Sequence, residues 1–588
     1  MKKMQNSDCA VCKIAKQLKW YTAIWIGVAI LKIKVNGTKR FHISSIDFDS
    51  KNKRWIITAL LVIVGFFFSF WNDMQFYENG KISVEKAWYW LGKIVFFVLL
   101  FLGWNEILLK TWNKEKQHML KCVLIYFIPM LILLILTWPG VWRSDEMYVL
   151  RALQQGKLYF WQHWITSMFY MLCLQLCPVP GIIVVVQVFI ISIIVGDIVY
   201  RSYGCFEKVK KGRYAYFLYF SLFLPTILDN NLSPIRASLC SYLELWILFQ
   251  IIFCGLEKKK YSMEKMCKLA VIAAIAASWR PENIIYVAAL PAACFIWKNI
   301  NLKKNIVFLC LTGLLMGTIM TIQNNGLRQQ ELVTQEGYCI SDKDRYAFSG
   351  MVEPLAQLIV EDFKSDTKEE DLKFINEVIS LDAIDAYGGI GAFWQGGLRN
   401  LSPENLMVIK KLYVRLVFEN WDLFLQQRFQ YFLKTKGFGF RIVTCLKSAA
   451  HLYDEDIGEY SGEEMAYWYK DFQRRYLWNQ PLNVEVRKHI ISFLEGKKIT
   501  DYEYSTSALE LFFQNAVPFL VLLILVGILE LVNKRMVFPF VIMFILGKCF
   551  IVMLTAPAMY FMYYFSAYLS SAIVCVMACL CRKFVTVP

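Results

Sequence analysis

Two long runs of uncharged, apolar residues limit what this chain can fold into. The runs "VLIYFIPMLILLILTW" (123–138) and "IIVVVQVFIISIIVG" (182–196) contain no charged side chain. A helix of about 20 mainly apolar residues crosses the ~30 Å hydrocarbon core of a membrane. Composition agrees, because 57% of the 588 residues are hydrophobic and 19% are charged, against roughly 45–50% and 25% in soluble domains. The sequence predicts an all-α polytopic membrane protein.

The apolar runs predict about 12 transmembrane helices. They span 55–71, 88–109, 119–138, 182–200, 214–229, 235–256, 266–279, 284–298, 305–322, 513–532, 537–555 and 559–581. A further run, 164–178, is too brief to cross comfortably and ends in Cys-Pro-Val-Pro-Gly. We interpret it as a re-entrant or interfacial half-helix, which membranes tolerate where protein or a wet cavity surrounds its ends.

Basic residues beside the apolar runs indicate the orientation. They occur in the connections 110–121, 201–213, 257–268, 298–304 and 533–535, and at Arg582 and Lys583. If the N-terminus is cytoplasmic and 164–178 does not cross, all of these face the cytoplasm, as the positive-inside rule requires. We therefore expect a multi-pass protein of the cell membrane with both termini cytoplasmic. The formal charge of +17 does not indicate nucleic-acid binding, because these residues form no single stripe.

Four regions follow from this topology. Residues 1–54 form a cytoplasmic segment, 55–322 a transmembrane module with an outer loop at 139–163, 323–510 an extracytoplasmic domain, and 511–588 the last transmembrane helices. The extracytoplasmic domain is expected to be mainly helical, because apolar residues recur every three or four positions after Ser402 and Pro403. The glycine-rich stretch 387–397 is expected to be a loop.

The chain ends and the cysteines carry weaker signals. The polar N-terminus lacks the apolar core of a secretory signal. Most of the 17 cysteines lie in apolar segments, where cysteine behaves as a small hydrophobic residue. Cys339 and Cys445 fall in the polar segment and allow at most one disulfide bond there. Cys9 and Cys12 have the spacing of half a metal site, but no second pair follows.

The outer loop carries adjacent acids, Asp145 and Glu146, directly above the apolar runs. They can simply begin an amphipathic helix capped by Ser144, since acids in a first turn favour the helix dipole. Alternatively, they bind a divalent cation such as Mg²⁺ or Mn²⁺, or take a proton from a hydroxyl. His163 ends the same loop and can join such a site or act as an interfacial anchor, and Trp164 beside it belongs to an aromatic belt or stacks on a sugar.

Charged residues at two later outward turns form a second group of candidates. Arg280 and Glu282 lie in "SWRPEN", and Arg236 lies in "NNLSPIR". Charge at membrane depth is expensive and therefore suggests function, and an arginine fork suits a phosphate. The alternative is that Arg280 pairs with an acid only to hold helices together. Asp229, Asn230 and Asn231 are expected to be turn residues.

The last apolar run adds tyrosines. Tyr560, Tyr563 and Tyr564 are expected near the outer end of the last span, as a belt or as substrate contacts. Glu244 is an isolated acid inside a predicted span, and is either a relay or a contact between helices.

The order of these features resembles the GT-C superfamily of membrane glycosyltransferases. The resemblance comprises Pro139-Gly140, the acid-bearing first outer loop, the amphipathic helix, the histidine step into a short apolar run, the later "RPE", and a large external domain before the last spans. It covers most of 119–322 and, more loosely, the rest of the chain. It implies transfer of a sugar from a polyprenyl phosphate to an envelope acceptor on the outer face of the membrane.

The resemblance also implies roles for residues. Asp145 matches the loop acid that activates the acceptor, directly or through a metal; Glu146 matches its neighbour; and Arg280 matches a basic residue near the donor phosphate. Many members carry a second spaced acid or a His-Pro-Pro step, where this chain has Asp-Glu and His163-Trp164. The alternatives are a transporter or flippase for a lipid-linked or anionic substrate, and a non-enzymatic envelope scaffold. A transporter usually shows internal repeats, and none is visible.

Overall fold

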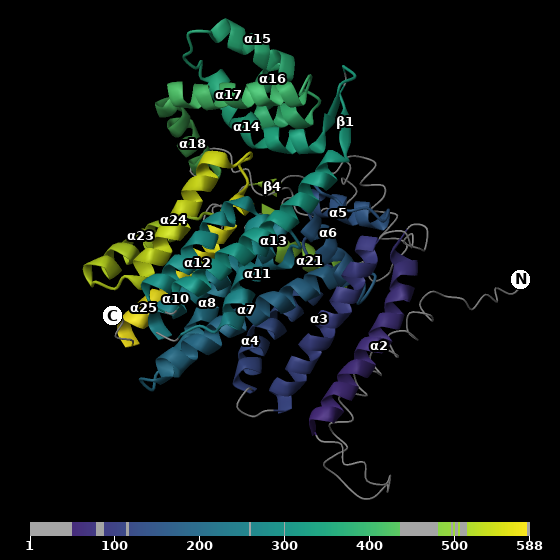
Figure 1. Ribbon diagram of the computed structural model, residues 1–588, viewed down its shortest axis with the longest axis vertical. Helices are drawn as coiled ribbons and strands as arrows, with labels where there is room; N and C mark the ends of the chain where they lie inside the picture. The colour runs from purple at the N-terminus through teal and green to yellow at the C-terminus, as the bar shows by residue number, and fades with distance from the viewer. Residues whose placement is uncertain are drawn as a thin grey trace, which may run out of the picture. The chain divides into compact units, whose positions relative to one another are not determined.

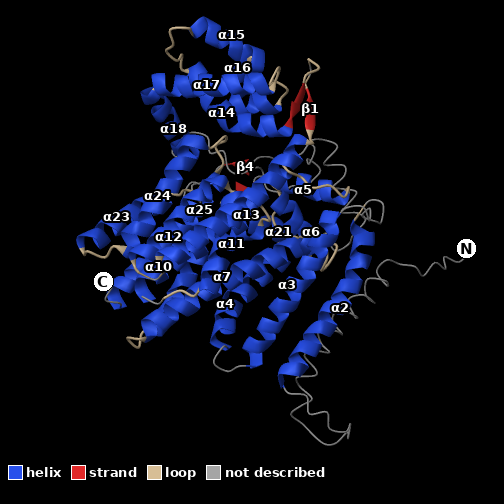
Figure 2. Ribbon diagram, viewed as in Figure 1, coloured by secondary structure: helices blue, strands red, loops and turns tan. Residues whose placement is uncertain are grey.

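The computed structural model describes most of the chain as helix. The described residues are 50–77, 87–112, 117–257, 260–298, 300–334, 336–435, 480–495, 498–499, 504–505 and 514–584. Figure 2 shows helices throughout, with two short antiparallel strand pairs in this part of the chain. Residues 1–49, which include Cys9 and Cys12, and residue Cys445 lie outside the described residues.

The polar segment 323–510 divides the elements of the apolar part of the chain into two groups (Figure 1). They are α2 (Ser50–Phe76), α3 (Ala87–Trp112), α4 (Gln117–Leu136), α5 (Ser144–Gln154), α6 (Trp164–Leu174), α7 (Gly181–Glu207), η3 (Gly212–Phe217), α8 (Leu218–Leu222), α9 (Pro225–Leu232), α10 (Arg236–Glu257), α11 (Met263–Trp279), η4 (Pro281–Asn283), α12 (Ile284–Ile296), α13 (Leu302–Arg328), α23 (Val517–Val532), α24 (Val537–Thr555), η7 (Phe561–Tyr563) and α25 (Phe565–Phe584).

The apolar helices make this a multi-pass membrane protein. Within the described residues, seven helices are long and apolar enough to cross a membrane: α2, α4, α7, α10, α13, α24 and α25. Shorter apolar helices occupy 89–105, 164–174, 281–296 and 517–532. The all-α membrane class is therefore confirmed, whereas the predicted number of about 12 spans stays a prediction.

One predicted span is not a continuous helix. The run 214–229 is broken into η3, α8 and α9. Pro225 begins α9 after an extended Leu224, because proline lacks the N–H and the space that a continuing helix needs. The broken segment nevertheless follows α4 along its length. The Tyr216 hydroxyl lies 3.0 Å from His118 Nε2 near the start of α4, and Leu232 O accepts from the Val141 N–H at 2.9 Å beyond its end.

These contacts define two ends of the helix bundle. We call the end that carries 138–144, 229–236, 279–283 and 560–563 the Arg143 end, and the opposite one the His118 end. The short run 164–178 contains α6, whose 11 residues extend about 16 Å, half of a hydrocarbon core. This is the length expected for a half-helix. The Thr166 hydroxyl near its start accepts from Trp279 Nε1 at 2.8 Å, which attaches α6 to the Arg143 end.

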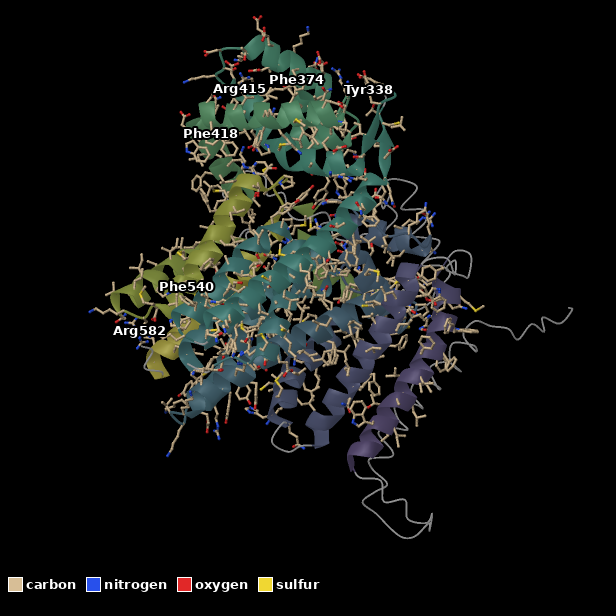
Figure 3. All side chains as sticks on the ribbon, in the orientation of Figure 1. Tyr338, Phe374, Arg415, Phe418, Phe540 and Arg582 are labelled. Atoms are coloured by element: carbon tan, nitrogen blue, oxygen red, sulfur yellow. The ribbon has the colours of Figure 1, made fainter. Side chains whose placement is uncertain are left out.

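The described part of 323–510 is mainly helical, as expected. Its elements are β1 (Glu331–Val333), β2 (Cys339–Ser341), α14 (Asp342–Val360), α15 (Lys368–Val378), α16 (Leu381–Trp394), α17 (Pro403–Glu419), α18 (Trp421–Thr435), α21 (Val484–Glu495), β3 (Lys498–Ile499) and β4 (Tyr504–Ser505). Helices α14 to α18 enclose a hydrophobic core of their own, with Phe348, Leu355 and Ile409 fully buried. Arg415 joins two of these helices by donating to Asp371 at 2.5 Å (Figure 3).

The glycine-rich stretch 387–397 was expected to be a loop, and this is wrong. Helix α16 continues through it to Trp394 with a kink at Gly388, whose φ of 74° only glycine adopts freely. Gly389 explains why small residues stand here, because a Cβ at this position would lie 2.5 Å from the backbone oxygen of Val352 in α14. The glycines therefore allow close helix packing. Cys339 is an exposed free cysteine, and Cys445, the other cysteine of this segment, lies outside the described residues.

Two buried arginines fasten this segment to the helices of the bundle. Arg428 of α18 donates to Met553 O at 3.0 Å and Ala556 O at 2.6 Å, at the end of α24. Arg487 of α21 donates to Thr137 O at 3.2 Å and Gly140 O at 2.9 Å, just beyond α4. The last carbonyls of a helix lack partners within it and carry partial negative charge, so each guanidinium satisfies such a helix end.

We expect Arg487→Met to destabilise the protein by about 3 kcal/mol, because carbonyls beyond α4 would lose charged hydrogen bonds in a buried place. The measurement is thermal unfolding in detergent, followed by a signal that reports helix loss. Glu485→Gln is the matched control, because Glu485 lies on the same helix but is exposed. Equal stability of the two variants would contradict a fastening role for Arg487.

Candidate active site

The loop at 139–163 is held at the start of α5 by Glu146. Its Oε2 accepts from the backbone N–H of Arg143 at 3.0 Å, and its side chain is buried. This is half of a capping box, in which the third residue of a helix satisfies an N–H before the first turn. This contact gives Glu146 a structural role at the start of its own helix, and its catalytic role stays a prediction.

A buried ion pair fixes the same loop to α9. Arg143 Nη2 donates to Asp229 Oδ2 at 3.1 Å, and both side chains are almost fully buried. Asp229, Asn230 and Asn231 were expected in a turn, but they belong to α9 and are buried. Removing one partner of a buried pair leaves an uncompensated charge, so Arg143 and Asp229 together set the position of the acid that follows.

Asp145 is half-buried. Burial raises the pKa of its carboxyl above the usual aspartate range, while the positive charges of Arg236 and Arg143 and a hydrogen bond from Gln162 oppose the rise. The carboxylate thus meets a guanidinium from α10 and an amide from the end of its own loop. A carboxyl with a raised pKa is a stronger proton acceptor than an ordinary aspartate.

Arg236 is the cation at the centre of the predicted residues. Its charge interacts with Asp145, Glu282, His163 and Tyr563. No residue in the described part of the chain forms a hydrogen bond or an ion pair within 4 Å with its half-buried guanidinium. The five donors of this fork therefore remain available for an anion.

Arg280, in contrast, is already engaged. Its Nε donates to Glu282 Oε1 at 2.5 Å, its Nη1 donates to Met562 O at 3.4 Å, and its guanidinium carbon lies 5.8 Å from the centre of the Tyr563 ring. The alternative of an arginine paired with an acid to hold the chain therefore describes Arg280. The pair joins the turn before α12 to the turn before α25, so Glu282 acts as the partner of Arg280.

His163 and Trp164 turn the loop into α6. His163 has a φ of 71°, and its Nδ1 accepts from the Ile165 N–H at 3.3 Å. Burial first, and then the charge of Arg236, lower the pKa of His163 to about 3, so the imidazole is neutral at physiological pH. Its Nε2 is buried and has no partner among the described residues. Trp164 instead donates from Nε1 to Ile319 O at 3.1 Å, which holds the loop on α13.

Two of the predicted tyrosines lie beside these charges. The rings of Tyr560 and Tyr563 stack with centres 6.5 Å apart, and Tyr563 interacts electrostatically with Arg280, Asp145 and Arg236. Tyr563 lies in η7, and Tyr560 is the extended residue before η7. Both precede α25, and so the expectation that they line the last helix is wrong. Tyr564 is buried against Phe432 of α18. Only Tyr560 and Tyr563 therefore join the site.

The predicted metal ligands do not come together. In the parts of the chain that the structure describes, no three histidine, cysteine, aspartate or glutamate side chains are grouped to hold a metal ion. Glu146 is turned to Arg143, and the Nδ1 of His163 faces the backbone of α6. Asp145, Glu146 and His163 are adjacent in the loop but point to different partners. This chain therefore does not fit the three-ligand metal site expected from sequence.

A second buried polar network lies deeper, next to Glu282. Glu244 was expected to be isolated, but Lys548 of α24 donates to its Oε2, and Tyr286 donates to its Oε1 at 2.5 Å. Lys548 also donates to Asn283 Oδ1 at 2.6 Å and Ser566 Oγ at 2.9 Å. The ammonium thereby uses three hydrogen bonds and joins α10, α12, α24 and α25. The sequence signal that we missed was a lysine within an otherwise apolar run.

The buried Glu146 predicts how stability depends on pH. Burial, then the charge of Asp145, raise the pKa of its carboxyl to about 8, with Arg143 opposing. Because an unfolded glutamate has a pKa near 4.3, the folded state binds the proton more tightly, and stability falls as pH rises from about 4.3 to about 8. We expect a loss of about 1.4 kcal/mol per pH unit within this window, measured by thermal unfolding at several pH values.

Glu146→Gln should flatten this dependence, because glutamine keeps the acceptor for the Arg143 N–H without titrating. Glu370→Gln is the matched control on an exposed acid and should keep the dependence. A variant at Glu146 that unfolds with the same pH profile as the unaltered protein would contradict the assignment.

Comparison with known proteins identifies no relative for this arrangement. No family model, curated protein or solved structure matches the chain.

Proposed function

We propose that this protein is a membrane glycosyltransferase that moves a sugar from a polyprenyl-phosphate donor to an acceptor of the cell envelope. The observation that carries the proposal is the electrostatic interaction of Asp145, a half-buried carboxyl, with Arg236, whose guanidinium forms no hydrogen bond or ion pair with a described residue. They meet at one end of a bundle of apolar helices. A donor with a lipid tail and a charged headgroup would present its reacting bond at such an end.

The chemistry needs one base and one cation. The acceptor oxygen attacks the anomeric carbon of the sugar, the bond from that carbon to the phosphate oxygen breaks, and polyprenyl phosphate leaves with the electron pair. The hydroxyl proton passes to Asp145 as the new bond forms. Arg236 stabilises the charge that develops on the departing phosphate, and such fixed donors act strongly where water is scarce.

This assignment differs from the one drawn from sequence. Arg280 was expected near the donor phosphate, but its ion pair with Glu282 leaves it to hold the turn. Arg236 takes that role. Tyr560 and Tyr563 contact the substrate, and the Nε2–H of the neutral His163 imidazole donates a hydrogen bond, because its Nδ1 already accepts one. No step is assigned to Mg²⁺ or Mn²⁺, because the described residues hold no group of three candidate metal ligands around Asp145.

The basic connections support the orientation. With the connections 110–121 and 201–213 in the cytoplasm, the His118 end is cytoplasmic and the Arg143 end faces outward. The site and helices α14 to α18 then lie on the outer side of the cell membrane, with both chain termini in the cytoplasm. A lipid-linked donor is available there.

The direct test is to reconstitute the full chain in vesicles with a short-chain polyprenyl phosphate that carries a radiolabelled hexose. We expect labelled sugar to leave the lipid and free polyprenyl phosphate to accumulate, with water or an added envelope extract as the acceptor. A transporter would move the intact lipid between leaflets without breaking this bond. A scaffold would do neither and would tolerate alanine at both Asp145 and Arg236.

One structural feature would suit the transporter alternative: the buried ion pair between Glu244 and Lys548. Its hydrogen-bonding groups are occupied by neighbouring helices, as in a contact that holds a bundle together. The glycosyltransferase proposal therefore accounts for more of the charged residues.

A further inference from the structure

A cluster of aromatic rings joins the loop 155–163 to helices α14 and α16. The ring of Trp161 lies 5.1 Å from that of Trp394, with an interplanar angle of 69°, and 5.4 Å from that of Tyr346. Phe393 completes the cluster, 5.0 Å from Trp394. Trp394 is 52% exposed, so part of its ring is open to solvent. Packing in the hydrophobic core does not explain why a tryptophan stands at a half-exposed position.

A charged pair borders these rings. The guanidinium carbon of Arg345 lies 5.3 Å from the centre of Trp161 and 5.7 Å from that of Trp394. Arg345 Nη1 donates to Asp342 Oδ1 at 2.6 Å, and the side chains of Arg345 and Asp342 are 12% and 15% exposed. The cluster thus combines flat apolar faces with a hydrogen-bond donor and a carboxylate acceptor.

The cluster is next to the candidate active site. Trp161 directly precedes Gln162, whose side chain hydrogen-bonds to Asp145. Tyr159, two residues earlier, stacks on Tyr148 of α5 with ring centres 6.2 Å apart. The charges of Asp145, Asp342 and Arg345 all act on Tyr159, so the acid and the charged pair share this tyrosine as a neighbour. A molecule on the rings would reach toward Asp145.

We propose that Trp161, Tyr346 and Trp394, with Arg345 and Asp342 at their edge, form a binding platform for a β-linked hexose chain that serves as the acceptor. This deepens the proposed function and rests on it. The axial C–H groups of a β-linked pyranose carry partial positive charge, and the negative face of an aromatic ring attracts them. The equatorial hydroxyls of the same sugar point sideways, where Arg345 donates and Asp342 accepts.

The test measures equilibrium binding of radiolabelled chitotetraose to the detergent-solubilised full chain. We expect Trp394→Ala to weaken binding about tenfold, equivalent to about 1.4 kcal/mol, and Trp394→Phe to remain within about threefold, because phenylalanine keeps a ring face. Trp421→Ala is the control, since Trp421 is exposed on α18 and outside the platform. Trp394 is preferred to Trp161, which packs against the core of α14 to α18.

Asp145→Asn separates the two proposals. It should bind chitotetraose as the unaltered chain does, because Asp145 is outside the platform, while transfer is lost. The platform is disproved if the unaltered chain does not bind chitotetraose, or if Trp394→Ala binds it equally well. If the chain binds chitotetraose as expected but Asp145→Asn keeps full transfer, the platform is supported and the assignment of Asp145 as the base is wrong.

Discussion

Asp145→Asn is expected to lower the rate of sugar transfer by about 10²- to 10⁴-fold, the usual contribution of a general base. Asparagine keeps the size and the contact with Gln162 but cannot accept the proton of an acceptor hydroxyl. The measurement is kcat/KM for release of labelled hexose from the polyprenyl-phosphate donor. Because burial raises the pKa of Asp145, the rate of the unaltered chain should rise with pH through a pKa above the ordinary aspartate range.

Glu146→Gln is the matched control for this experiment. The two acids are adjacent, but Glu146 is turned to the Arg143 N–H, and so its variant should retain most of the transfer rate near neutral pH. A comparable loss in both variants would show that the loop acts as a structural unit, and no loss in Asp145→Asn would refute its role as the base.

Arg236→Met is expected to lower transfer by about 10²- to 10³-fold, the loss typical of removing one charge-stabilising donor. Methionine fills a similar volume without charge, and the guanidinium has no hydrogen bond or ion pair with a described residue that would be lost. The unfolding temperature should therefore change little. Arg236→Lys should restore part of the rate, because an ammonium supplies charge without the planar fork that suits phosphate.

Arg280→Met distinguishes the two arginines. It removes the ion-pair partner of Glu282, and an uncompensated buried carboxylate is strongly destabilising, so the unfolding temperature should fall. The opposite result is that Arg236→Met loses stability and keeps transfer within about threefold, while Arg280→Met keeps stability and loses transfer. That result would favour the sequence-based assignment of Arg280 to the phosphate.

The errors of the sequence reasoning share a physical cause. Hydropathy shows that 214–229 is apolar, but it does not show that the helix breaks there. Pro225 breaks the helix through its backbone conformation, and the run remains apolar. Glycines at 388 and 389 were taken for a loop, although close packing against α14 also requires small residues. Local sequence patterns do not show which other residue a side chain contacts in the folded protein.

The candidate site shows the same division. Asp145, Arg236, Arg280 and Tyr563 were chosen from sequence because charge and aromatic rings stood beside apolar runs, and the structure brings them to the same end of the bundle. Arg143, Asp229 and Arg487 were missed as supports. Their signal is a polar residue near an apolar run, and this signal is common at every membrane boundary.

By itself, the sequence determined that this chain is an all-α membrane protein with a helical polar segment and that its candidate charges gather at helix ends, because apolar length and charge position are properties of local composition. Only the tertiary structure decided which arginine stays uncommitted, which acid is turned to its own helix, and which tryptophan meets Arg345. These outcomes depend on contacts between residues far apart in the chain. A side chain that is hydrogen-bonded to one neighbour is engaged there, and a side chain without such a neighbour can bind a ligand.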